Sequence, residues 1–107
     1  MGYPMDTETK VYTRYSILTE DINRGGVARL CREHRVDCTL YAGVGLFNGN
    51  IEESLTVVHL APLEANVREE IKALARDIKA ENNQREIWIT EETVTLKKLL
   101  DNTPAIG

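Results

Sequence analysis

Three stretches of the chain alternate apolar with polar residues, which is the pattern of strands that bury one face. The first covers residues 12–20 and is rich in β-branched and aromatic side chains. The second covers residues 39–62 and is interrupted once near its middle. The third covers residues 86–90, and residues 93–100 either extend it or form a last short helix. The pattern therefore predicts four strands.

Asn48 and Gly49 interrupt the second stretch as a two-residue hairpin turn would. Asn-Gly is the preferred pair for a type I′ turn, because both central residues must accept positive φ. Pairing outward from this turn sorts the side chains onto two faces. One face is mainly apolar and is expected to face the core. It holds Leu40, Ala42, Val44, Leu46, Ile51, Glu53, Leu55, Val57 and His59. The other is mixed, and its large apolar members are Tyr41, Phe47, Val58 and Leu60.

Two further stretches carry apolar residues at helical spacing. A short helix is expected after Asp21 or Asn23, either of which can cap it. Its apolar stripe consists of Val27, Leu30, Cys31 and His34. A second helix is expected over about residues 64–82. Its stripe consists of Val67, Ile71, Leu74, Ala75 and Ile78.

The resulting order is β-α-β-β-α-β, which is the ferredoxin-like arrangement. We therefore expect an α+β sandwich, with an antiparallel four-stranded sheet and two helices on one face. The 107 residues suffice for one domain, expected at residues 11–100 between flexible tails at 1–10 and 101–107. The other sheet face stays open in this arrangement. Because that face carries large apolar side chains, with Trp88 a further candidate, we expect a homo-oligomer, a trimer rather than a dimer.

The charge balance limits the partners. The chain has 17 acidic and 13 basic residues, a net charge of −4. Its basic residues are interspersed with acidic ones, whereas duplex nucleic acid calls for a clustered positive field. No run approaches the roughly 18 apolar residues of a membrane helix, and the N-terminus has no signal-peptide core. With two cysteines, too few for a disulfide scaffold, we expect a cytoplasmic protein.

A glycine-containing turn is the candidate ligand site. Free N–H groups at a helix N-terminus bind anions, glycine allows a phosphate to approach, and arginine forks onto it. The turn stands where the first helix begins, and two further arginines would add charge. A small anionic ligand is therefore predicted at Arg14, Asn23, Arg24, Gly25, Gly26 and Arg29. The alternative is a glycine turn that only reverses the chain from strand into helix.

Metal ligation is a weaker hypothesis. Cys31, His34 and Cys38 could converge on zinc, with His59 as a fourth ligand. However, Cys31 lies on an apolar stripe, where a free cysteine commonly packs as a small hydrophobe. We expect core packing for these residues, and no metal or cofactor.

Catalytic residues are not expected either. Glu52 and Glu53 follow the hairpin turn, and Glu91 and Glu92 follow the last predicted strand. Adjacent strand residues point to opposite faces, so neither pair forms an acid–base couple. His59 is interpreted as a core histidine.

The element order resembles that of the PII signalling proteins and their CutA-type metal-tolerance relatives. The resemblance covers roughly residues 12–94, and it implies a ferredoxin-like fold. PII proteins have a long loop where this chain has a tight turn at residues 47–50, so no family binding residue is carried over. The strings RYSILTED and TLYAGVGLFNG also resemble short reading frames of phages and mobile elements. That likeness implies an antagonist of host defence.

Together these features predict a non-enzymatic homo-oligomer that senses or sequesters a small anionic, nucleotide-like ligand. Sequestration of a nucleotide signal by a phage protein is the most specific version. The first alternative is a protein–protein adaptor that docks through the open sheet face. The second is a small enzyme that uses His59 or Glu53, or a metal-tolerance protein.

Overall fold

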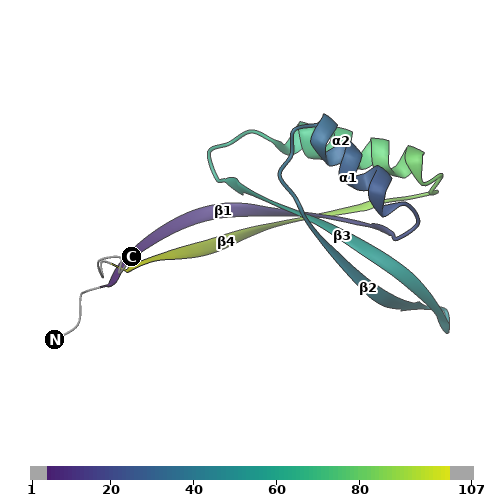
Figure 1. The fold of residues 1–107 in the computed structure, drawn as a ribbon, viewed down its shortest axis with the longest axis horizontal. Helices are drawn as coiled ribbons and strands as arrows, with labels where there is room; N and C mark the ends of the chain where they lie inside the picture. The colour runs from purple at the N-terminus through teal and green to yellow at the C-terminus, as the bar shows by residue number, and fades with distance from the viewer. Residues whose placement is uncertain (1–4, 102–107) are drawn as a thin grey trace, which may run out of the picture.

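The computed structural model describes residues 5–101 and has the predicted α+β, ferredoxin-like fold. Its elements are β1 (Met5–Glu20), α1 (Arg24–Glu33), β2 (Thr39–Phe47), β3 (Asn50–Pro62), α2 (Arg68–Glu81) and β4 (Trp88–Asp101). The four strands form one sheet in the order β2-β3-β1-β4, with every neighbouring pair antiparallel. Both helices lie against the same face of this sheet (Figure 1).

The hairpin has the predicted turn and register. Asn48 and Gly49 have φ values of 51° and 79°, as a type I′ turn requires. Phe47 pairs with Asn50, so the two predicted faces are present. The face with Leu55 and Val57 lies under the helices, and both side chains are buried.

Both helices have sequence-encoded ends. The side chain of Asn23 caps α1, since its Oδ1 accepts a hydrogen bond from the Gly26 N–H at 3.0 Å. Each helix ends where a residue with positive φ reverses the chain: Arg35 after α1 and Asn83 after α2. The second helix begins at Arg68, four residues later than its apolar pattern suggests, because residues 63–67 form a turn and a short irregular segment.

The core lies between the helices and the central part of the sheet. Its buried members come from both helices, from β1 and β3, and from the α1–β2 connection. They are Tyr15, Ile17, Val27, Leu30, Cys31, Val36, Leu55, Val57, Ala61, Ile71, Leu74, Ala75 and Ile78. No helix among residues 5–101 is long and apolar enough to cross a membrane.

Two parts of the sheet extend beyond the helices as two-stranded arms (Figure 1). The hairpin arm is the outer part of β2 and β3, and the ribbon arm is the outer part of β1 and β4. The radius of gyration is 17.8 Å, against about 13 Å for a compact domain of this length. On the hairpin arm, Leu46 and Ile51 are each 73% exposed, although they share the face of the core strands. The helices are too short to cover both arms.

The ribbon arm changes the expected chain ends. Residues 5–10, predicted as part of a flexible tail, belong to β1 and pair with residues 96–101 of β4. The stretch at residues 93–100 is a strand, the first of its two predicted forms. Neither segment shows clean apolar alternation, and residues 8–11 and 97–99 of this ribbon are exposed to solvent. The rest of both predicted tails lies outside the described residues.

Candidate functional site at the Trp88 end of the sheet

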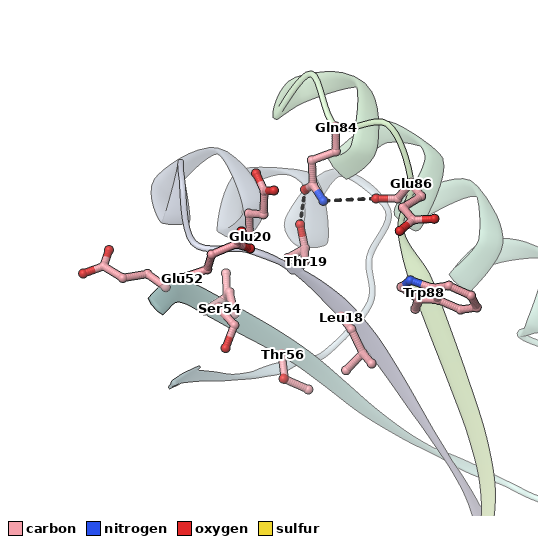
Figure 2. Close-up of a pocket in the computed structure, with 11 residues that line it drawn as sticks. Leu18, Thr19, Glu20, Glu52, Ser54, Thr56, Gln84, Glu86 and Trp88 are labelled. Carbon is pink, nitrogen blue, oxygen red and sulfur yellow. Dashed lines mark hydrogen bonds between the residues drawn. The ribbon is translucent and has the colours of Figure 1, made fainter. Parts of the chain in front are cut away.

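A pocket of about 500 Å³ lies where β1 ends and where β3 and β4 begin. The α2–β4 connection closes one side of it (Figure 2). The lining residues are Leu18, Thr19, Glu20, Glu52, Glu53, Ser54, Leu55, Thr56, Gln84, Glu86 and Trp88. Ligand sites in proteins span roughly 300–1,000 Å³, so the pocket can hold a small molecule.

Trp88 supplies the aromatic surface of this pocket. It is the first residue of β4 and pairs with Leu18 across the sheet. Both side chains are on the open face, as predicted for Trp88, and the indole is 63% exposed. An exposed indole next to a leucine offers a flat apolar surface on which a base or another ring can stack.

The charges at the pocket are acidic. Glu20, Glu52, Glu53 and Glu86 line it, and no lysine or arginine is among the described residues that do so. Glu53 lies near the start of β3, and its backbone carbonyl accepts a hydrogen bond from the Asp21 N–H at 3.2 Å. The four glutamates give this end of the sheet a negative charge, which favours cationic groups, although the charge of Glu53 also acts on Arg24 at the start of α1.

A polar network holds the α2–β4 connection against β1. The amide nitrogen of Asn82 donates to Thr19 Oγ1 at 3.2 Å and to Gln84 Oε1 at 2.9 Å. Thr19 also donates to Gln84 Oε1, and Gln84 Nε2 donates to the Glu86 carbonyl at 3.2 Å (Figure 2). Asn82 Oδ1 is buried without a hydrogen-bond partner among the described residues. The network fixes the segment that carries Gln84, Glu86 and Trp88.

The predicted anion site lies on the other side of the sheet, at the start of α1. Asn23 and Gly26 are joined by the cap described above, and a Cβ on Gly26 would stand only 2.5 Å from Asn23 Nδ2. Close packing therefore accounts for glycine at this position. Arg24 Nη2 donates to Asp21 Oδ2 at 2.5 Å, and this hydrogen bond raises the pKa of the guanidinium. Gly25 follows within the first turn of α1.

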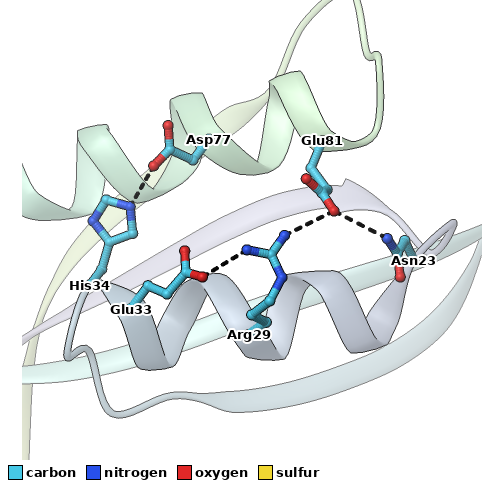
Figure 3. A network of polar contacts seen from close by, with 6 residues as sticks. All are labelled: Asn23, Arg29, Glu33, His34, Asp77 and Glu81. Atoms are coloured by element: carbon cyan, nitrogen blue, oxygen red, sulfur yellow. Dashed lines mark hydrogen bonds and ion pairs between the residues drawn. The ribbon is translucent and has the colours of Figure 1, made fainter.

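The two remaining arginines of the prediction are not equivalent. Arg29 is on α1, where its guanidinium bridges Glu33 at 2.8 Å and Glu81 at 3.0 Å (Figure 3). Arg14 is on the open face of β1, paired with Glu92 at 2.9 Å in a second hollow. Five of the six predicted residues therefore lie together and Arg14 does not. The anion site stays a prediction, with its three guanidinium groups each paired to a carboxylate.

His34 links the two helices. Its Nδ1 lies 2.6 Å from Glu70 Oε1, and its Nε2 lies 2.6 Å from Asp77 Oδ2; Figure 3 shows the second contact. Ionised carboxylates only accept hydrogen bonds, so both ring nitrogens must donate, which requires the imidazolium. The hydrogen bond to Glu70 is the main cause that raises the pKa of His34. Its place at the C-terminus of α1 also favours the positive charge.

Raising the pH should therefore weaken the protein through His34. The pKa is higher in the folded state than the value of about 6.5 in an unfolded chain, so the stabilisation is complete below pH 6.5. It is lost as the pH rises through the folded value, and we expect a loss on the order of 1 kcal/mol from these partly exposed pairs. Urea denaturation of wild type and His34→Gln across this range measures it. A stability difference that does not shrink with rising pH contradicts the assignment.

The other candidate ligands point elsewhere. His34 faces α2 instead of the two cysteines, and His59 Nδ1 lies 2.7 Å from the Asp37 carbonyl. Among the residues with described side chains, no group of three or more His, Cys, Asp or Glu residues could hold a metal ion. Glu52 and Glu53 are exposed at the rim of the pocket.

Sequence reasoning missed the pocket as a site. Its walls come from residues 18–20, 52–56 and 84–88, and no local spacing connects these three segments. From the sequence, Trp88 is a candidate for the open face, where packing at an interface is favoured over stacking on a base. The one signal in the sequence is the single tryptophan of the chain at the start of a predicted strand, with Gln84 and Glu86 just before it.

Comparison with known proteins gives a structural result only. No family model matches the chain, and no curated protein matches it. Solved structures do match, among them the apo form of CPII from Thiomonas intermedia K12, a nitrogen regulatory PII-like protein (TM-score 0.59, 10% identity, 87% of this chain and 99% of that one). CPII bound to ADP, AMP and bicarbonate matches with a TM-score of 0.57 and 10% identity, over 83% of this chain and 96% of that one. A phage SAM lyase in complex with S-methyl-5′-thioadenosine matches with a TM-score of 0.58 and 10% identity, over 81% of this chain and 90% of that one.

The lyase corrects one expectation from the sequence. From the sequence we expect a protein without enzymatic activity. That expectation is wrong for this fold, because an enzyme has it at the same level of structural similarity as the regulatory proteins. At about 10% identity the likeness concerns the fold alone. The chain has the ferredoxin-like fold of the PII-like proteins.

Proposed function

We propose that this protein binds a small adenosine-containing ligand in the Trp88 pocket. The exposed indole in a pocket of about 500 Å³ carries the proposal. CPII binds ADP and AMP in its structure, and the phage SAM lyase binds S-methyl-5′-thioadenosine in its own. All three ligands contain an adenosine group. Stacking a base on an aromatic side chain contributes roughly 1–3 kcal/mol.

The charge of the pocket favours one kind of adenosine ligand. A di- or triphosphate would meet Glu20, Glu52, Glu53 and Glu86 with no described basic partner at the lining. SAM is a sulfonium cation joined to adenosine, and the same carboxylates would attract it. We therefore favour a cationic adenosine derivative in this pocket.

An anionic nucleotide at the start of α1 is the second candidate. It is the ligand that the glycine turn at residues 23–26 suggests, and Arg24 and Arg29 would have to leave Asp21, Glu33 and Glu81 to bind it. Sequestering such a nucleotide to counter host defence would be its biological use. The likeness to a phage protein favours this setting.

We also propose that the protein is a homo-oligomer in which a second copy covers the hairpin arm. Val44, Leu46 and Ile51 continue the core face of the sheet past the helices, and all three are exposed. The hairpin between Thr39 and Pro62 has only Glu52 and Glu53 among the Asp, Glu, Lys and Arg residues of the chain, so little charge opposes burial of its apolar side chains. An exposed apolar patch of this kind favours contact with a second copy.

Titration of a defined set of ligands tests the proposal. The set is SAM, S-methyl-5′-thioadenosine, AMP, ADP and a cyclic dinucleotide, each followed by calorimetry and then by chromatography for turnover. Because the chain has one tryptophan, quenching of its fluorescence reports directly on the pocket. Tighter binding of SAM than of ADP, with quenching, supports the Trp88 pocket. Binding of the anions alone without quenching supports the α1 site, and no binding of any of them contradicts both.

A further inference from the structure

A second hollow lies on the open face of the sheet, beside the Trp88 pocket, and has a volume of about 540 Å³. Its lining includes Arg14, Ser16, Val58, Leu60, Glu92 and Val94. Arg14 and Glu92 lie on its β1–β4 side, whereas Tyr41 lies on its far side, on β2. The hollow takes no part in holding the adenosine group proposed above.

The two hollows follow one another along the same strands. Leu18 lines the Trp88 pocket, and Ser16 and Arg14 line the second hollow. Since alternate residues of a strand point to the same face, these three side chains all lie on the open face. Arg14 stands four positions before Leu18, which is about 13 Å along an extended strand. A ligand of that length held at Trp88 would reach the second hollow.

An ion pair lies in the second hollow. Arg14 and Glu92 are cross-strand partners, and Arg14 Nη2 donates to Glu92 Oε2 at 2.9 Å. Their side chains are 43% and 51% exposed. Among the described residues, this single contact leaves the other N–H groups of the guanidinium and Glu92 Oε1 without a hydrogen-bond partner. Both charged groups can therefore bind further partners from the solvent side.

The surroundings of this ion pair are apolar. Leu60 is the partner of Arg14 on β3, and Val94 lies two residues after Glu92 on the same face of β4. Ser16 is only 8% exposed, although both helices lie on the opposite face (Figure 1). Hydrogen bonds are stronger where water is partly excluded. The hollow therefore suits a group that carries both charges next to an aliphatic chain.

Building on the proposed function, we propose that the second hollow binds the amino-acid group of a ligand whose adenosine lies at Trp88. The α-carboxylate accepts hydrogen bonds from Arg14, and the α-ammonium donates to Glu92 Oε1. A lone anion would be repelled by Glu92 and a lone cation by Arg14, whereas a zwitterion is attracted by both. SAM has such a group joined to adenosine through its sulfonium, and its extended length is comparable to the separation of the two hollows.

Binding of two uncharged adenosine thioethers tests this site. S-adenosylhomocysteine and S-methyl-5′-thioadenosine both carry adenosine on a neutral sulfur, and only the first has an amino-acid group. Calorimetry should show that the wild type binds S-adenosylhomocysteine about 10- to 100-fold more tightly, as expected for hydrogen bonds between charged groups. Arg14→Gln should remove most of this difference and leave the affinity for S-methyl-5′-thioadenosine unchanged.

Arg68→Gln is the matched control. Arg68 is paired with Glu91 at 2.9 Å, and Glu91 points to the opposite face of the sheet from Glu92, so this change should alter neither affinity. Equal affinities of the wild type for the two thioethers would overturn the amino-acid site and leave the adenosine site standing. A difference that Arg14→Gln preserves would do the same. Binding of neither thioether would overturn both sites.

Discussion

The double variant Leu46→Glu, Ile51→Glu is expected to be a monomer under conditions in which the wild type is an oligomer. The two residues are direct cross-strand partners, and each is 73% exposed in a single copy. Burial of a large apolar side chain contributes roughly 1.5–3 kcal/mol. Losing both should raise the dissociation constant at least about 100-fold. Light scattering after size-exclusion chromatography reports the mass, which is 12.1 kDa for one copy.

A matched substitution separates position from chemistry. Ile22→Glu introduces the same charge at another exposed isoleucine, in the turn between β1 and α1. It should leave the assembly unchanged, whereas Ile51→Glu alone should weaken it. Since all three positions are exposed, circular dichroism should show a folded chain in every case. A wild type that stays a monomer at high concentration would contradict the homo-oligomer and favour an adaptor that docks on another protein.

Replacing Trp88 with alanine is expected to weaken binding of an adenosine ligand by about 5- to 150-fold. This range corresponds to the roughly 1–3 kcal/mol of a base stacked on an aromatic ring. The fold should tolerate the change, since the indole is largely outside the core. Calorimetric titration with SAM and with AMP measures the loss, and Trp88→Phe should keep part of the affinity because a ring remains.

Two further variants locate the ligand. Tyr41→Ala removes another exposed aromatic side chain from the same sheet, on β2 and outside the Trp88 pocket, and should not change affinity. Arg24→Ala should be neutral if the ligand lies in the pocket and should weaken binding if it lies at the start of α1. Equal affinities for wild type and Trp88→Ala would remove the pocket as the site.

Features encoded by neighbouring residues were predictable from the sequence. The Asn48-Gly49 turn sets its own φ angles and therefore the register of the hairpin, and Asn23 caps α1 through a contact three residues away. The apolar stripe of α2 identified its core residues, such as Leu74, for the same reason. Each of these depends on contacts within one turn or one hairpin.

Features that depend on distant segments were not predictable. Residues 6–10 are polar, and they form a strand only because residues 96–100 lie beside them. The contacts of His34 with Glu70 and Asp77 span 36 and 43 residues. The carboxylates of the Trp88 pocket come from two strands and the α2–β4 connection, so their common location appears only once the sheet is assembled.

The position of β1 in the sheet has a consequence for how the chain folds. β1 is the first strand along the chain, yet it is a central strand, and one of its two neighbours is β4, the last element. The fourteen residue pairs between them join segments 70 to 96 residues apart. During synthesis, one side of β1 therefore stays an open edge after the helices and the hairpin have formed, able to pair with another nascent chain. Only the arrival of β4 closes that edge and completes the floor of the Trp88 pocket.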